Sequence, residues 1–191
     1  DPHTAFSPII HAVNLPAAIL LRANLPYKTL EEFIAAAKQQ RGKFNYASSG
    51  SGSTQHIAAE LFKATTGTFI VHIPYRGSGP ALVDLMAGQV QLSFDTLASV
   101  APHIKSGKVR ALGVTSTTRN AQLPGVPTMA EAGVKGVEMS AWYGVYMPAS
   151  TPAALQARVQ SEIAKIMTLP DTVTRLAAIG ADLTPLTHAQ F

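Results

Sequence analysis

The chain has no cysteine, few charged residues and no long hydrophobic run. With no cysteine among its 191 residues, it has no disulfides, thiolate zinc sites, iron–sulfur clusters or cysteine nucleophiles. Its longest apolar run, at about residues 15–21, is interrupted by Pro16 and is well short of the roughly 20 residues that a bilayer-spanning helix needs. We therefore expect no part of this chain to be embedded in a membrane.

Charged residues make up 14% of the chain and hydrophobic residues 47%, so enough apolar surface is present to offset the entropy that is lost on folding. Lysine and arginine exceed aspartate and glutamate by 15 to 11, which gives a net charge of +4. The densest basic group has no interleaved aromatic residue and lies at a predicted helix end, where cations complement the helix dipole: His103, Lys105, Lys108 and Arg110. This balance favours small anions and predicts no nucleic-acid partner.

Strands that alternate with short helices dominate the predicted organisation. We expect strands at about residues 44–47, 68–73, 90–94 and 109–114, and helices at about residues 30–40, 54–66, 81–87 and 97–105. Thr29 and Glu32 form a capping box at the start of the first of these helices. Such alternation is typical of a mostly parallel sheet with right-handed crossovers, so the predicted fold class is α/β.

The two flanks of this region are less regular. Residues 11–22 predict either a pair of buried strands or one long strand broken at Pro16. After the alternating region we expect a helical turn at residues 128–132, a strand at 138–146, and helices at about 153–167 and 171–179. Residues 187–191 are typical of the first turn of another helix, with Thr187 as its N-cap.

The strongest local signal for a binding site lies between the strand at 44–47 and the helix that follows it. Glycines in this loop let backbone amides approach a ligand closely, and the helix N-terminus adds positive partial charge beside several hydroxyl donors. The loop therefore predicts an anion cradle, with an ordinary capped strand-to-helix loop as the alternative. Its candidate ligand-binding residues are Ser48, Ser49, Gly50, Gly52, Ser53 and Thr54.

A second turn, also after a strand and before a helix, adds an aromatic ring and a guanidinium: Tyr75, Arg76 and Gly77. A third strand-to-helix junction carries Asp95, which is either a cap at a strand end or a ligand-binding carboxylate. In an open α/β sheet, ligands bind outside the carboxyl ends of the strands. We therefore expect these three junctions to form one site.

Sequence motifs of common enzymes and cofactor sites are absent. The segment around Gly50 and Gly52 lacks a third glycine and has no P-loop lysine, and neither G-x-S-x-G nor H-E-x-x-H occurs. His56 and Glu60 share a helix face, but without further ligands nearby we interpret them as a structural polar pair. His72, in a predicted strand, is interpreted as a buried, hydrogen-bonded residue. The sequence thus predicts no catalytic residue, no metal and no cofactor.

With these residues in view, the chain resembles the receptor component of tripartite tricarboxylate transporters, the Bug or TctC-type periplasmic solute-binding proteins. The matching motifs follow one another along nearly the whole chain: FNYASSGSGSTQH at residues 44–56, HIPYRG at 72–77, GQVQLSFD at 88–95, GKVRAL at 107–112, LPGVPT at 123–128, EAG at 131–133 and WYG at 142–144.

This resemblance implies a type II periplasmic-binding-protein-like, two-lobed Venus-flytrap fold without catalysis. Such a receptor grips a small carboxylate and delivers it to membrane permease subunits, and one carboxylate group is typically held by amides, hydroxyls and bridging waters. The resemblance also implies that the chain is truncated at both ends, without its signal peptide and the N-terminal part of lobe one. Residues 1–24 would be a lobe-one remnant with a hinge strand, 25–113 the complete second lobe, and 114–191 the hinge return with the rest of lobe one. Exposed sheet edges of a truncated lobe could drive self-association.

Two alternative functions stay open at this stage. One is a ligand-dependent signalling receptor that contacts a membrane sensor, and the other is an enzyme that acts on an anionic substrate. Arg76 indicates an anion but does not distinguish an aliphatic dicarboxylate, an aromatic acid, an amino acid or a vitamin.

Overall fold

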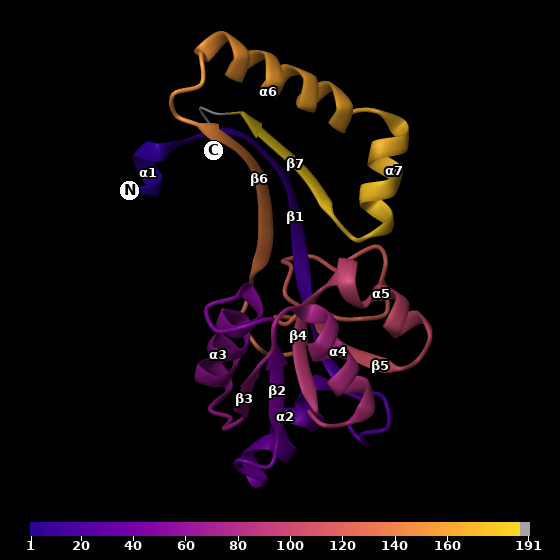
Figure 1. The fold of residues 1–191 in the computed structure, drawn as a ribbon. Helices are drawn as coiled ribbons and strands as arrows, with labels where there is room; N and C mark the ends of the chain where they lie inside the picture. The colour runs from indigo at the N-terminus through magenta and orange to yellow at the C-terminus, as the bar shows by residue number, and fades with distance from the viewer. Residues whose placement is uncertain (188–191) are drawn as a thin grey trace. The chain divides into compact units, whose positions relative to one another are not determined.

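The structure is a computed structural model that describes residues 1–187. Helices and strands alternate through most of the chain (Figure 1). In chain order the elements are α1 (Pro2–Ala5), β1 (Phe6–Arg22), α2 (Leu30–Gln39), β2 (Asn45–Ser48), α3 (Thr54–Thr66), β3 (Val71–Pro74), α4 (Ser78–Ala87), β4 (Leu92–Thr96), α5 (Leu97–Lys105), β5 (Val109–Val114), β6 (Ser140–Pro148), α6 (Ala153–Met167), α7 (Pro170–Ala178) and β7 (Asp182–Thr187).

The chain divides into two compact units. Unit 1 consists of Asp1–Leu15 with Ala141–Phe191, and unit 2 consists of Pro16–Ser140. Strand β1 therefore contributes its first part to unit 1 and its second part to unit 2. Every predicted ligand-binding residue lies in unit 2.

The sheet of unit 2 has the strand order β3-β2-β4-β1-β5. Strand β2 pairs in parallel with both β3 and β4. Strand β1 lies between β4 and β5 and pairs antiparallel with both, for example through Ala18 with Asp95 and with Val114. The expected parallel arrangement thus holds for β2, β3 and β4, while β1 makes the sheet mixed.

Strand β1 is a single strand of 17 residues and is not broken at Pro16, contrary to our expectation. Pro16 instead lies where the pairing partners change: Asn14 pairs with β7, whereas Ala17 pairs with β4. Proline has no N–H to donate to a ladder, so a position between two ladders tolerates it well.

The core of unit 2 covers both faces of its sheet. Successive side chains of a strand point to opposite faces, so Ile19 and Leu21 join one hydrophobic cluster with α2 and α3. Ala18 and Leu20 join the other, with α4 and α5. None of these four side chains has exposed surface, which explains the continuous apolar run in the sequence, since a central strand is buried on both sides.

Of two local predictions, one is confirmed and one is wrong. The Ala132 amide donates to the Thr128 carbonyl oxygen at 3.0 Å, so residues 128–132 form the single helical turn that the sequence predicts, which ends before Gly133 with φ +85°. Thr187 is not a helix N-cap: it is the last residue of β7, whose backbone pairs with Ile10 of β1. The rest of that predicted helix, residues 188–191, lies outside the described residues.

Unit 1 contains β7, most of β6, the start of β1 and helices α6 and α7. Its helices expose much of their apolar surface, including Leu155, Ile166 and Val173. Over residues 1–187, we find no helix with the length and apolarity required to cross a membrane.

Candidate functional site

Three strand-to-helix junctions of unit 2 are hydrogen-bonded to one another. The Tyr75 amide donates to the carbonyl oxygen of Ser48 at 3.0 Å, and the Gly77 amide donates to that of Ser49 at 3.2 Å. The predicted cradle after β2 and the predicted turn after β3 are therefore adjacent. The junction after β4 joins them through side chains.

A partly buried chain of polar groups makes that connection. Gln55 Oε1 accepts from the Ser49 amide at 2.5 Å, and Gln55 Nε2 donates to Ser78 Oγ at 2.7 Å. Ser78 Oγ donates to Asp95 Oδ1 at 3.2 Å, and the Thr96 amide donates to the same oxygen at 2.7 Å. Gln55 and Asp95 are both buried. One continuous network thus links the ends of β2, β3 and β4.

Gln55 and Ser78 are site residues that were not predicted from the sequence. Gln55 precedes Ala58, Ala59 and Phe62 on the buried face of α3, at the helical spacing of three, four and seven residues. A glutamine on such a face needs hydrogen-bond partners inside the protein, and this signal could have identified it. Ser78 has no comparable sequence signal, since its role depends on where Asp95 lies.

Within the cradle, several predicted donors already have protein partners. Ser53 is the N-cap of α3: its hydroxyl accepts from the His56 amide at 3.2 Å and donates to the Gly50 carbonyl oxygen at 2.7 Å. The Gly52 amide donates to His56 Nδ1 at 3.0 Å. Ser48 has no exposed surface. For Ser48 and Ser53, these contacts match the alternative of an ordinary capped strand-to-helix loop. That either residue contacts a ligand stays a prediction.

We predict that Ser53→Ala destabilises the protein by about 1 kcal/mol, because the first turn of α3 loses its side-chain cap. The measurement is the free energy of unfolding in urea. Ser51→Ala is the matched control, since Ser51 lies exposed in the same loop and its loss should cost less than about 0.5 kcal/mol. Equal effects of the two substitutions would show that the cap is not stabilising.

Other hydrogen-bond donors at this edge of the sheet are available to a ligand. Helix α4 follows Gly77, whose φ of +105° suits glycine, and no side chain caps it. Helix α5 follows Thr96, and again no side-chain cap is present. Arg76 is exposed, and Ser49 and Thr54 are partly exposed. The amides of two helix first turns and these polar side chains can therefore receive an anion.

The Tyr75 hydroxyl is hydrogen-bonded to a residue of α4. Its hydroxyl donates to Asp84 Oδ2 at 2.7 Å. Burial, together with this bond to a carboxylate, raises the pKa of Tyr75 to about 12. The phenol proton therefore stays on the ring oxygen and points to α4, and the ring itself is the part of Tyr75 that can frame a ligand.

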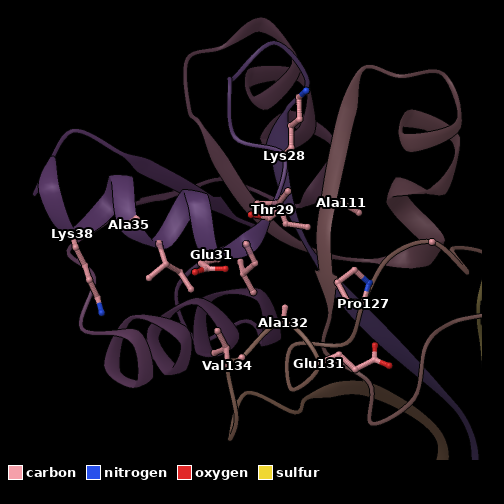
Figure 2. A pocket seen from close by; sticks show the side chains of 15 residues that line it. Lys28, Thr29, Glu31, Ala35, Lys38, Ala111, Pro127, Glu131, Ala132 and Val134 are labelled. Carbon is pink, nitrogen blue, oxygen red and sulfur yellow. The ribbon is translucent and has the colours of Figure 1, made fainter.

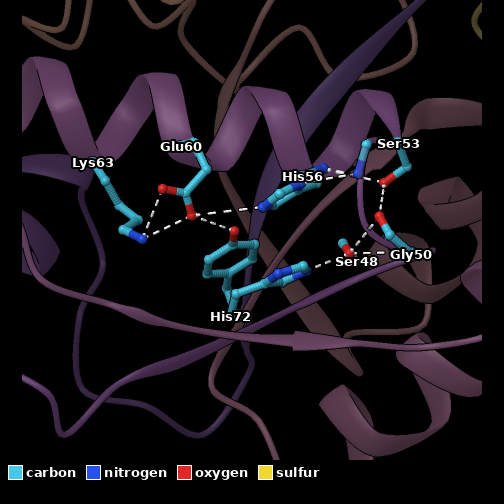
Figure 3. A network of polar contacts seen from close by, with 9 residues as sticks. Ser48, Gly50, Ser53, His56, Glu60, Lys63 and His72 are labelled. Atoms are coloured by element: carbon cyan, nitrogen blue, oxygen red, sulfur yellow. Dashed lines mark hydrogen bonds and ion pairs between the residues drawn. The ribbon is translucent and has the colours of Figure 1, made fainter.

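A stack of rings lies beneath the cradle (Figure 3). His72 is stacked on His56 with ring centroids 4.2 Å apart and on Tyr46 with centroids 4.7 Å apart. Glu60 accepts from the Tyr46 hydroxyl at 2.6 Å and from Lys63 Nζ at 2.7 Å. His56 Nε2 lies 3.9 Å from Glu60 Oε1. Among the side chains that the structure describes, no group of three or more potential metal ligands occurs.

Ser48 and His72 have the spacing of a nucleophile and its base, with Ser48 Oγ 2.7 Å from His72 Nε2. The serine hydroxyl is fully buried and also contacts the Gly50 backbone. A nucleophile must reach its substrate, so this pair braces the loop in the present structure.

Stability should fall on acidification because of His72. Burial, and then the adjacent His56, lower the pKa of His72 below its ordinary value. As pH falls, His72 therefore takes up a proton in the unfolded chain before it does so in the folded protein. The stability that neutral His72 contributes to the folded protein is fully present above about pH 6.5 and is lost as pH falls below this value. Thermal unfolding between pH 7.5 and 5.5 measures this loss. His72→Gln should reduce the slope and His103→Gln should not; an unchanged slope in His72→Gln would contradict the assignment.

Unit 2 also has a cavity outside these junctions (Figure 2). It has a volume of about 920 Å³ and is lined by α2, β5 and residues 125–134. Its charged lining is balanced, with Lys28 and Lys38 against Glu31 and Glu131. Hydrogen bonds from the Thr128 amide and Arg119 lower the pKa of Glu131. None of the predicted ligand-binding residues lines this cavity, and its mixed charge does not favour an anion.

Comparison with protein families gives a match over residues 1–190 to the tripartite tricarboxylate transporter family receptor. Among curated relatives, a UPF0065 protein from Pseudomonas sp. strain P51 is 40% identical over 176 residues, which are 92% of this chain and 52% of the relative. The Bordetella pertussis protein BugT is 34% identical over 174 residues, or 91% of this chain and 53% of the relative. The chain thus spans about half the length of these relatives.

Solved structures share the fold. An R. palustris protein solved with adipate superposes with a TM-score of 0.95 at 34% identity, covering 99% of this chain and 63% of the other. The α/β, periplasmic-binding-protein-like fold that the sequence predicts is confirmed by this match.

Proposed function

The chain belongs to the receptor family of tripartite tricarboxylate transporters, and from this premise we propose that it captures a small carboxylate at the three junctions in unit 2. The observation that carries the proposal is the pair of helix N-termini, of α4 and α5, that no side chain caps. Such N-termini offer unsatisfied amides and a positive partial charge to an anion. The adipate-bound relative makes dicarboxylates the first class to test.

In this proposal, one carboxylate group of the ligand accepts hydrogen bonds from first-turn amides of α4 and α5. Arg76 supplies a guanidinium, which forms strong, charge-assisted bonds to carboxylates, and Ser49 and Thr54 supply hydroxyl donors. The remaining predicted site residues shape and support the loops that carry these donors: Ser48, Gly50, Gly52, Ser53, Tyr75, Gly77 and Asp95.

We further propose that the protein acts as a periplasmic receptor that hands its ligand to membrane permease subunits and does not catalyse a reaction. Family membership supports this role, as does a solved relative described as a periplasmic transporter. The same proposal includes the division into lobes, with residues 25–113 as lobe two. It also includes self-association through exposed sheet edges.

Titration calorimetry of the full chain with adipate and with malate tests the proposal. Adipamide is the matched control, since it has the same carbon skeleton as adipate with neutral ends. Saturable heat with either acid and none with adipamide is the expected result. Equal heats with adipate and adipamide, or no heat with either acid, would overturn the proposal.

A further inference from the structure

Asp95 carries a buried oxygen, Oδ2, without a hydrogen-bond partner. Among the described side chains, two buried polar atoms lack a hydrogen-bond partner, Oδ2 of Asp95 and Nε of Arg22. Asp95 has no exposed surface. A buried carboxyl oxygen without a partner is costly, and the cost is far larger for an ionised carboxylate than for a neutral acid.

The direction of the surrounding hydrogen bonds shows which oxygen can hold a proton. The Gln55 amide group is oriented by the Ser49 N–H, so its Nε2 must donate to Ser78 Oγ. Ser78 Oγ donates to Asp95 Oδ1, which also accepts from the Thr96 N–H. Oδ1 thus has two donors and Oδ2 has none, which makes Oδ2 the favoured position for a proton on the carboxyl group.

No positive charge compensates Asp95. Its polar neighbours are neutral, namely Gln55 from α3, Ser78 from α4 and Thr96, and the residue opposite it on β1 is Ala18. Asp95 takes part in no salt bridge among residues 1–187. Its hydrogen bonds favour the ionised form, but burial outweighs them and raises the pKa of Asp95.

The charged and titratable groups of the adjoining loops are Arg76, Asp84, His56 and His72. Arg76 is exposed, Asp84 accepts from the Tyr75 hydroxyl, and the two histidines are stacked on each other beneath the cradle. These histidines can contribute their own pH dependence, so any test of Asp95 must isolate it from them.

We propose that Asp95 is a neutral acid with its proton on Oδ2 in the ligand-free protein, and that loss of this proton weakens anion binding at the neighbouring helix N-termini. Asp95 contacts Ser78, the first residue of α4, and Thr96, the N-cap of α5. An ionised Asp95 would be an internal anion at the same positive helix ends that a ligand carboxylate uses. The second half of this proposal rests on the proposed function, whereas the first half does not.

The first half is tested without a ligand. If the pKa of Asp95 is higher in the folded than in the unfolded state, the free energy of unfolding falls as pH rises above about 3.9, the pKa of an aspartate in the unfolded chain. Asp95→Asn keeps a neutral group that can still accept at Oδ1, so it should unfold at a higher temperature than the wild type at pH 8, with a difference that shrinks toward pH 4. Asp182→Asn, an exposed control, should show no such difference. A lower unfolding temperature of Asp95→Asn at pH 8 would overturn the proposal. Titration of the Asp95 carboxyl ¹³C shift in the wild type gives the same answer if the variant does not fold.

The second half is tested by the adipate affinity of the wild type and of Asp95→Asn across the pH range in which the Asp95 carboxyl ¹³C shift of the wild type titrates. Ionisation of the ligand carboxyl groups, whose pKa values lie near 4, affects both proteins alike. For the wild type, affinity should fall on the order of tenfold as Asp95 ionises, the size of a Coulomb interaction across roughly 10 Å at an effective dielectric constant of about 20. Asp95→Asn should lose this fall and keep only the part due to the histidines. Adipate binding with the same pH dependence in both proteins would overturn the second half and leave the proposed function standing. Absence of adipate binding at every pH would overturn the proposed function and with it the second half.

Discussion

Replacement of Gln55 by leucine is expected to weaken adipate binding by on the order of tenfold or more and to destabilise unit 2 by about 2 kcal/mol. Leucine neither accepts from the Ser49 amide nor donates to Ser78 Oγ, and both of these groups lose a short hydrogen bond. The junctions after β2 and β3 then lose their side-chain connection to Asp95. The ligand donors at these junctions would no longer be held in one arrangement.

Calorimetry with adipate and urea unfolding measure the two effects. Gln39→Leu is the matched control, because Gln39 is exposed on α2 and its replacement should leave both quantities nearly unchanged. Gln55→Glu is a second variant: it still accepts from the Ser49 amide but adds a negative charge beside Asp95, so it should weaken adipate binding further. Wild-type affinity in Gln55→Leu would contradict the role assigned to this network.

Thr115→Val is expected to lower the free energy of unfolding by about 2 to 3 kcal/mol, because it leaves buried backbone groups without a partner. The Thr115 hydroxyl accepts from the Ala17 amide at 3.0 Å and lies 2.5 Å from the Met139 carbonyl oxygen. Thr115 is 1% exposed, so water cannot replace it. Ala17 and Met139 are each within two residues of the points where the chain passes between the two units.

Urea unfolding of Thr115→Val and of the control Thr117→Val measures this effect. Thr117 is exposed two residues further along, and its loss should cost less than about 0.5 kcal/mol. Valine has nearly the shape of threonine, so a large difference between the variants reports on the hydroxyl rather than on packing. A loss below about 0.5 kcal/mol in Thr115→Val would contradict the argument.

Local chemistry predicts the helices of unit 2 well. The Thr29 and Glu32 capping box is present at the start of α2, and Gly67 ends α3 with the left-handed backbone that glycine favours. These signals depend on residues a few positions apart, so a single sequence contains them. The same kind of signal predicts the single helical turn at Thr128, where the hydrogen bonds of a capping box form with Glu131 and the Ala132 amide donates to the Thr128 carbonyl oxygen.

Pairings between distant segments are not predictable in this way. The apolar run of β1 indicates a strand buried on both faces, but nothing in it specifies that Ala18 pairs with both Asp95 and Val114. The site shows the same limit. The glycine and serine pattern after β2 predicts the position of the site, whereas the partners of Gln55 and Asp95 depend on how three distant junctions meet.

The most direct test of this account follows backbone amide chemical shifts while the full chain is titrated with adipate. If the ligand binds at the uncapped helix N-termini, the largest shift changes should occur at the amides of residues 76–79 and 97–98, with smaller changes around Ser49. Changes concentrated at Lys28, Lys38 and the other residues that line the 920 Å³ cavity, or no changes at all, would contradict the central claim.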